Sequence, residues 1–517
     1  MASFLLLECL EKIFLNLLDN IYEFRTDSFY VNKSTKDLHS CTLVSKHWCR
    51  ISTPLLYAYP FANYCRNAAD LAFSYSKLIR TLISCTPKSE IEQLILSESS
   101  NPTFNYITFI RSLNFDLDIL DELNCFKELW LPPFVLNNIK KDQIPKLSHL
   151  IINQLAKSLC ENCNNNLTRL DFTFTNKNNN IKFLNSIIEP LTFNYCDEKN
   201  KLTNLKELYY NNHHDNKIDI YSTFSNHIHN LNLLHNEGNN SIEKANSLSR
   251  FISLQKKLKH LILSENSMYN DHGDYYNIVF ESLPTQNENL QILNLRSIPF
   301  DKINEKALNS LCLLKNIKEL RLHYCIADMN NLIPWAKDLK GLEVFEFLSY
   351  YDIGFENLVN QIIRSSSATL KKLIIDYHRK NKQDYKSLYQ QIPIHLKSLI
   401  YLDLPEICPD ELILIFKLCT RLVYLGIMLS NDASWRTKIK NLGESIPKNL
   451  RKIQFKDRFV SIFKVNHLKC FFEECLKNDS ELKYLEIIDN SEIDQKYHDI
   501  ANKFGIKLIY IQRIPYR

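Results

Sequence analysis

The sequence predicts an α/β solenoid, in which a curved parallel sheet is covered by outer helices, preceded by a small all-helical segment. Two observations carry this prediction. A hexamer with apolar residues at its first, fourth and sixth positions returns fifteen times, at intervals of about 27 residues. Before the first hexamer, apolar residues recur instead at steps of three and four, which is the period of an amphipathic helix. The 517 residues have room for both parts.

The helical segment occupies residues 1–60. From Leu5 to Leu17 the apolar residues follow one face of a helix. A polar stretch near 19–36 has no periodicity and predicts an inserted loop. Asp37 is a suitable cap for the next helical stretch, and Pro54 is expected to close it, because a proline ring disfavours a helix interior. Helices this short cannot bury their apolar faces alone, so they need the rest of the chain or a partner.

A helical linker is expected over residues 61–104. Its apolar residues, Leu78 and Leu82 among them, are again four apart, and Pro102 marks its end. The repeats then fill residues 105–517. Irregular spacing of the hexamers predicts an irregular array rather than a uniform one.

The hexamers predict one strand and one helix per repeat. The last three residues of each hexamer form a short strand whose two apolar side chains point inward, while the residue between them points outward. The remainder returns as a helix, as over 355–363 and 411–418. Each unit can bury its apolar face only against its neighbours, so the units stack. This hexamer and period are the leucine-rich-repeat signature. The hexamers begin at Ile110, Phe126, Leu147, Leu167, Leu205, Ile228, Leu258, Leu290, Ile317, Leu342, Leu370, Leu399, Leu422, Leu450 and Leu482.

The outward strand positions would line the concave face of the solenoid. They mix acidic, basic and tyrosine side chains, whereas a groove for a polyanion would be dominated by Lys and Arg. A mixed surface with aromatic anchors suits a protein partner better, although each residue taken singly also fits a solvated sheet face. The candidate partner-binding residues are Arg169, Glu207, Tyr209, His260, Glu319, Arg321, Lys372, Tyr401, Asp403, Tyr424 and Tyr484.

Composition excludes several classes of function. The seven glycines are at least 13 residues apart, so no dinucleotide, phosphate-binding or nucleophile-elbow motif can form. No residue pattern indicates catalysis, and we expect no enzyme activity, cofactor or metal. A net charge of +5 gives no general attraction to nucleic acid or membrane, and no apolar run is long enough to span a bilayer. Fifteen thinly spread cysteines suggest reduced thiols, hence a cytoplasmic or nuclear location.

Two stretches near the N-terminus resemble an F-box. They are LLLECLEKIF at 5–14 and DLHSCTLVSKHW at 37–48, in which Ile-Phe, Asp-Leu and Leu-Val-x-Lys-x-Trp are the specific parts. With the repeats behind them, the whole chain resembles an F-box/leucine-rich-repeat protein of the kind expanded in fungi. It departs from that pattern in two ways: the usual Leu-Pro opening is Leu5-Leu6, and the loop after the first helix carries roughly a dozen extra residues.

The resemblance implies a substrate-recognition subunit of a Skp–cullin–F-box ubiquitin ligase. The F-box would dock on the Skp adaptor and, through it, on the cullin and RING subunits, while the repeats hold a target protein. One alternative is a repeat scaffold that never engages a ligase, and in that case the N-terminal apolar residues would merely cap the solenoid. The adaptor-facing residues that the resemblance implies are Leu5, Leu6, Leu10, Ile13, Phe14, Leu17, Leu38, Leu43, Val44 and Trp48.

Overall fold

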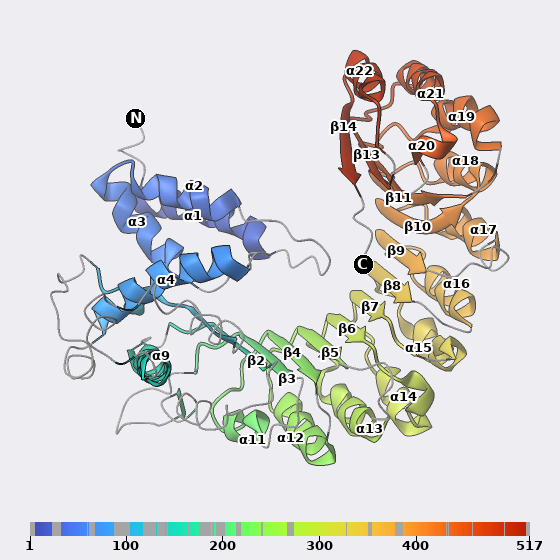
Figure 1. Ribbon diagram of the computed structural model, residues 1–517. Helices are drawn as coiled ribbons and strands as arrows, with labels where there is room; N and C mark the ends of the chain where they lie inside the picture. Colours follow the sequence, from blue (N-terminus) through green and yellow to red (C-terminus); the bar gives the residue numbers. More distant parts are fainter. Residues whose placement is uncertain are drawn as a thin grey trace. The chain divides into compact units, whose positions relative to one another are not determined.

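The computed structural model shows an alternation of strands and helices that follows the repeat pattern (Figure 1). The described residues are 6–22, 33–58, 60, 68–86, 104–116, 131, 140, 143–162, 166–174, 188, 191–192, 202–212, 219–238, 241–265, 273–326, 328–349, 354–377, 386–430, 432, 434–456, 459–490 and 492–512.

The chain is a leucine-rich-repeat solenoid. Within the described residues, fourteen strands form a parallel sheet whose strand order is the order of the sequence. The chain divides into two compact units: Met1–Asn239 with Leu254–Leu258, and Asn240–Ser253 with Lys259–Arg517. The helical segment and strands β1 to β4 belong to the first unit, and strands β5 to β14 belong to the second.

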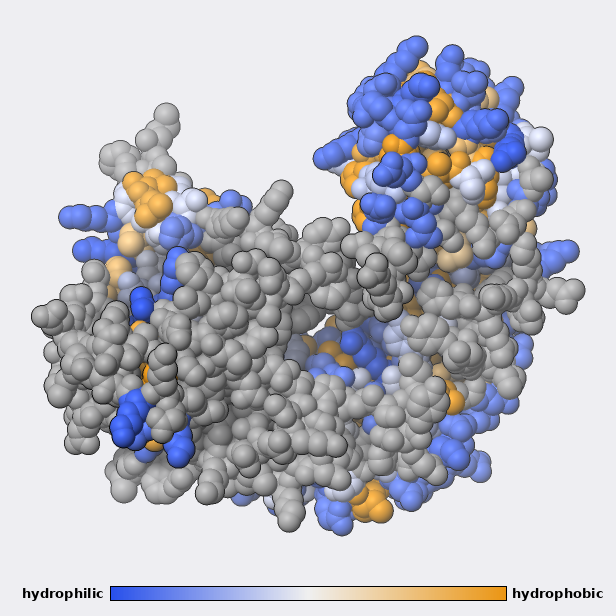
Figure 2. Space-filling view, in the orientation of Figure 1, coloured by the Kyte–Doolittle hydropathy of each residue, from blue (hydrophilic) through white to orange (hydrophobic). Residues whose placement is uncertain are grey.

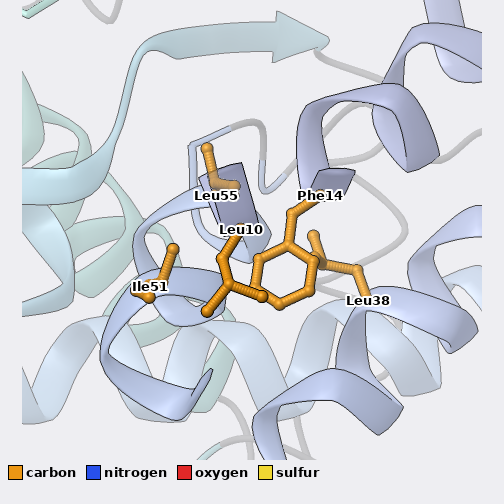
Figure 3. Packing of buried hydrophobic residues seen from close by; sticks show 5 residues of the cluster. All are labelled: Leu10, Phe14, Leu38, Ile51 and Leu55. Carbon is orange, nitrogen blue, oxygen red and sulfur yellow. The ribbon is translucent and has the colours of Figure 1, made fainter. Parts of the chain in front are cut away.

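The first three helices form a small bundle, here called the helical head. They are α1 (Leu7–Tyr22), α2 (Lys33–Thr42) and α3 (Lys46–Leu56). Figure 3 shows its core, in which side chains from all three helices meet. The core consists of Leu10, Phe14, Leu38, Ile51 and Leu55, with Trp48 packed edge-to-face on Phe14 at 5.2 Å between ring centroids.

Three expected boundaries in the helical head are wrong. Helix α1 runs to Tyr22 and α2 begins at Lys33, so the loop expected near 19–36 is shorter; residues 23–32 lie outside the described part. Asp37 lies inside α2, and Ser45 is the cap of α3 instead, since its Oγ accepts from the Trp48 N–H. Pro54 lies inside α3 and lacks the N–H that would bond the carbonyl four residues before it, but the helix continues for two more residues to Leu56.

The helical head joins the first strand through main-chain hydrogen bonds. In most repeats of the ladder, two successive N–H groups donate to one carbonyl of the preceding repeat, as Lys318 and Glu319 do to Gln291. At β1 (Ser112–Asp116) the N–H groups of Arg111 and Ser112 donate to the Ala58 carbonyl in the same way, at 2.8 and 3.1 Å. The end of the helical head therefore takes the place of a preceding strand.

The remaining described elements of the first unit are helices and strands that follow the helical head along the chain. Helix α4 lies within the expected linker 61–104, whose residues 61–67 and 87–103 are outside the described part. The elements are α4 (Ala68–Cys85), the 3-10 helix η2 (Tyr106–Phe109), α9 (Ile144–Asn162), β2 (Arg169–Phe174), β3 (Glu207–Asn212), α11 (Ile220–Phe224) and β4 (Leu233–Gly238).

Two hexamers of the first unit were misassigned. The hexamer at Leu147 lies in α9, where Leu150 is exposed; the buried residues there recur at helical spacing, which shares the step of three with the hexamer. In β4 the inward residues are Leu234 and Asn236, so the hexamer at Ile228 was read three residues early. A polar residue occupies the last inward position, and its Oδ1 accepts from Tyr221 Oη at 2.7 Å. The hexamer at Phe126 lies outside the described residues except for its last position.

The second unit repeats the strand–helix pattern with strands on the inner side and helices outside (Figure 1). Its elements are α12 (Ile242–Ser253), β5 (His260–Ser264), α13 (Gly273–Ser282), η3 (Leu283–Gln286), β6 (Ile292–Arg296), η4 (Phe300–Lys302), α14 (Glu305–Leu311), β7 (Glu319–His323), η5 (Met329–Leu332), α15 (Ile333–Asp338), β8 (Val344–Ser349), α16 (Phe355–Ser365), β9 (Lys372–Tyr377), α17 (Lys386–His395), β10 (Tyr401–Ile407), α18 (Pro409–Leu418), β11 (Tyr424–Leu429), α19 (Ser434–Ser445), β12 (Lys452–Lys456), α20 (Phe459–Ile462), α21 (Val465–Lys477), β13 (Tyr484–Asp489), α22 (Gln495–Lys503) and β14 (Lys507–Gln512).

The hexamer prediction is confirmed through the second unit, because the fourth and sixth residues of every expected hexamer are buried there. One strand was missed. In β14 the first hexamer position is Gly505, which has a positive φ of 70° and offers no apolar side chain, so the pattern was not recognised. Buried polar side chains also link neighbouring repeats: Ser366 Oγ donates to the Leu339 carbonyl at 2.6 Å, and Gln286 Nε2 to the Ile252 carbonyl at 2.9 Å.

Candidate partner-binding surfaces

The helical head exposes several large apolar side chains. Leu6 is 71% exposed and Leu43 is 76% exposed, and Leu7, Ile13 and Val44 are exposed as well. On α1 the apolar stripe is wider than the face that packs, so the side chains at its edges stay in solvent. Figure 2 shows apolar surface in this part of the molecule. Because exposed apolar side chains can mark interaction surfaces, the start of α1 and the turn between α2 and α3 are candidate docking positions of the helical head.

The expected adaptor-facing set therefore divides into surface and core. Leu6, Ile13, Leu43 and Val44 are available to a partner. Leu10, Phe14 and Leu38 are not available to a partner, because they are fully buried in the core of the helical head. Trp48 packs against this core at Phe14. This corrects the assignment of those core residues to a binding face. Leu5 lies outside the described residues, as does the side chain of Leu17.

The second candidate surface is the inner face, defined as the sheet face formed by the outward strand positions. Parallel pairing in register brings these positions into rows, each running across successive strands. Tyr401, for example, lies beside Tyr424, which lies beside Lys452. Within each unit the expected candidates at these positions thus lie on neighbouring strands, although they are far apart in sequence.

In the first unit, side chains of the inner face mainly contact one another. The guanidinium of Arg169 lies 4.0 Å from the centre of the Tyr209 ring, with Nη2 3.3 Å from Asp171 Oδ2 and Nη1 3.8 Å from Glu207 Oε2. Burial, helped by the neighbouring carboxylates, raises the pKa of Tyr209. Arg169 and Asp171 are both buried. These side chains therefore hold β2 and β3 together more than they present groups to a partner.

A cluster of two arginines and two histidines occupies β5 to β7. Arg321 bonds the carboxylates of Glu319 and Glu346 at 2.9 and 2.8 Å. Burial and then the guanidinium groups of Arg321 and Arg296 lower the pKa of His260 to about 4. The same causes lower the pKa of His323, which is buried, to about 3. Both imidazoles are therefore neutral at physiological pH.

Strands β9 to β12 carry a stack of aromatic and cationic side chains. The rings of Tyr401 and Tyr424 stack face to face, with centroids 4.0 Å apart and planes 7° apart. Lys372 Nζ lies 4.9 Å from the first ring and Lys452 Nζ lies 5.6 Å from the second. Tyr424 Oη also donates to Gln454 Oε1 at 3.0 Å, and burial raises its pKa. This part of the inner face is both aromatic and rigid.

Asp403 lies two residues after Tyr401 on the same face of β10 and is not accessible. It is 5% exposed, and Lys456 Nζ donates to its Oδ1 at 2.7 Å across the intervening strand β11. The pKa of the Asp403 carboxyl is raised by burial, which outweighs the opposing effect of Lys456. Asp403 is thus part of the support of the inner face, which corrects its assignment as a contact residue.

Sequence reasoning missed the third row of the inner face. Arg296, His323 and Lys456 each lie two residues beyond the outward position of a hexamer. The strands continue past the hexamer with the same period of two, and this continuation is the signal that would have found them.

Neither a membrane span nor a metal cluster is present in the described part of the chain. No helix there is long and apolar enough to cross a bilayer. No three His, Cys, Asp or Glu side chains within these ranges are placed to hold a metal ion.

Comparison with known proteins leaves the family open. No protein-family model matches the sequence, and no curated protein matches it. Among solved structures, the leucine-rich-repeat-containing protein LegL7 from Legionella pneumophila is 13% identical, covering 62% of this chain and 93% of that chain, with a TM-score of 0.33. A structure of the Rad7 and Elc1 complex in yeast gives 16% identity, 76% and 93% coverage, and a TM-score of 0.37. Both TM-scores are too low to establish a fold by similarity. The repeat fold is established instead by the strand order and register of the parallel sheet.

Proposed function

We propose that this chain is the substrate-recognition subunit of a Skp–cullin–F-box-type ubiquitin ligase. In this proposal the helical head docks on the Skp adaptor, and the inner face of the repeats binds a target protein. The chain performs no chemistry itself. It raises the effective concentration of the target beside the ubiquitin-loaded subunits.

The observation that supports the proposal most is the division of apolar residues in the helical head. Its core is complete with Leu10, Phe14, Leu38, Ile51 and Leu55, and yet Leu6 and Leu43 remain more than two-thirds exposed. A bundle that served only to cap the solenoid would gain nothing from exposed leucines, because burying an apolar side chain is worth about 1.5–3 kcal/mol. An apolar partner surface would bury them.

Co-purification with a Skp adaptor tests the proposal with a matched pair of variants. Leu6→Asp places a charge on the surface without harming the fold, because Leu6 precedes α1 and Asp is favoured at a helix start. Leu476→Asp is the control, since Leu476 on α21 is 70% exposed and undergoes the same chemical change.

We expect the unmutated chain and Leu476→Asp to retain the adaptor, and Leu6→Asp to lose it. If the unmutated chain does not bind the adaptor, the repeats function as a scaffold outside a ligase. Equal loss in the control variant would show that the head surface is not specific.

A further inference from the structure

One row of the inner face in the second unit differs from all its neighbours in charge. This row, here called the lysine–tyrosine row, consists of the first residues of β9 to β14, aligned by the strand pairing. Its members are Lys372, Tyr401, Tyr424, Lys452, Tyr484 and Lys507. It contains three cations, three aromatic rings and no carboxylate.

Two carboxylates in the next row of this part of the face are already engaged. Asp403 bonds Lys456, and Glu486 pairs with Lys452 and accepts from Gln454 Nε2 at 3.0 Å. Lys372 and Lys507, at the two ends of the row, form no ion pair with any carboxylate of the described residues. The row thus has a lysine without a direct ion pair at each end, and the charge of Lys372 acts at longer range on the Asp403 carboxyl.

The middle of the row offers aromatic surface that a partner can reach. Tyr484 is 42% exposed, and no hydrogen bond occupies its hydroxyl within the described ranges. The stacked rings of Tyr401 and Tyr424 are fixed between Lys372 and Lys452, so they lose little freedom on binding. The corresponding row of β5 to β8, by contrast, contains Glu319 and no Lys or Arg.

We infer that the lysine–tyrosine row binds an extended acidic segment of a partner protein, laid across strands β9 to β14. Its two end lysines would pair with carboxylates, and an apolar residue between these carboxylates would pack on the tyrosines. The inference rests on the proposed function only in that the repeats are taken as the target-binding part.

The strand spacing sets the length of the segment. Lys372 and Lys507 are five strand steps apart, which at about 4.8 Å per step is about 24 Å. An extended chain advances about 3.3 Å per residue, so its two carboxylates would be about seven residues apart. This spacing distinguishes the inference from a general attraction for anions.

Fluorescence anisotropy with labelled decapeptides tests it on the full chain. The probe has two Glu residues seven apart in a Ser-rich background, with Leu midway between them; the comparison peptides place the two Glu side by side or replace both with Lys. We expect the spaced acidic probe to bind at least about fivefold more tightly than either comparison peptide. In the double variant that combines Lys372→Glu with Lys507→Glu, the Lys peptide should instead bind more tightly than the acidic probe. Lys503→Glu, at the exposed end of α22, is the matched control and should leave binding unchanged.

Equal binding of the three peptides, or the same loss in the Lys503→Glu control, would overturn the inference. The inference would also fail if a ten-nucleotide single strand of thymidine bound more tightly than the acidic probe and lost its binding in the same double variant, since the row would then be a phosphate site. The adaptor co-purification of the double variant should be normal. If the adaptor fails to bind the unmutated chain while the acidic probe binds as expected, the ligase proposal fails and the inference stands.

Discussion

Substitution of Gly426 by alanine should destabilise the middle of the second unit. Because Gly426 has no side chain, it leaves room for the buried ion pair between Asp403 and Lys456. A Cβ at Gly426 would lie 2.8 Å from Cγ of Asp403 and 2.9 Å from each carboxylate oxygen. Ordinary contacts of this kind are about 3.5 Å or longer, so the carboxylate must move by several tenths of an ångström away from its place. The 2.7 Å bond between Lys456 Nζ and Asp403 Oδ1 would then be lost or distorted.

The expected cost follows from the worth of that bond. A hydrogen bond to a charged group contributes about 1.5–3 kcal/mol, and breaking a buried pair entirely costs about 3–5 kcal/mol. Lys456 is about a quarter exposed and can be partly rehydrated, so we expect about 2 kcal/mol. Amide hydrogen exchange in β10 to β12 should therefore become about 30-fold faster, since local opening reports local stability.

Two comparisons make this prediction specific. Gly341→Ala is the control, because a Cβ there meets nothing within 4 Å, and it should change local stability by less than about 0.5 kcal/mol. In an Asp403→Ala background, Gly426→Ala should cost little, because the group it displaces is gone. Equal exchange rates in Gly426→Ala and Gly341→Ala would refute the reasoning, as would an undiminished cost in the Asp403→Ala background.

Three further predictions follow from the packing. Because the pKa is lowered to about 4 in His260 and to about 3 in His323, the unfolded chain takes up protons first as pH falls below about 6.5. The stability that depends on the neutral imidazoles is full above about pH 6.5 and is lost progressively until pH reaches about 4 for His260 and about 3 for His323, so replacing both with Gln should flatten the acid limb of a urea-midpoint titration. Trp48→Ala should destabilise the helical head by about 3 kcal/mol in thermal melts, because it opens the core beside Phe14; an unchanged melt would place Trp48 outside the core. Ser366→Ala should cost about 1–2 kcal/mol in chemical denaturation by leaving the Leu339 carbonyl without this donor, and a neutral result would contradict its role in linking repeats.

The spacing of leucines predicts the repeats well because each strand buries the same two positions. It fails where another residue type takes an apolar place, as Asn236 does in β4 and Gly505 does before β14. It also fails where a helix shares the step of three, as at Leu147 in α9. A periodicity argument cannot separate these cases, since the difference lies in what packs on each side.

The candidate surfaces are less predictable than the fold. Outward strand positions can be read from the sequence, but burial at those positions cannot, because it depends on side chains from neighbouring repeats. Asp403 is inaccessible owing to Lys456, which is 53 residues away in sequence. In the helical head, Leu6 and Leu10 belong to the same apolar stripe, and only the packing of α2 and α3 decides which one faces solvent.

Hydrogen exchange of the full chain with and without a Skp adaptor tests most directly whether the helical head is the docking element. The account predicts slower exchange in the presence of the adaptor at residues 6–14 and at the turn between α2 and α3, with no change in β9 to β14. Unchanged exchange in the helical head, or protection confined to the repeats, would contradict it.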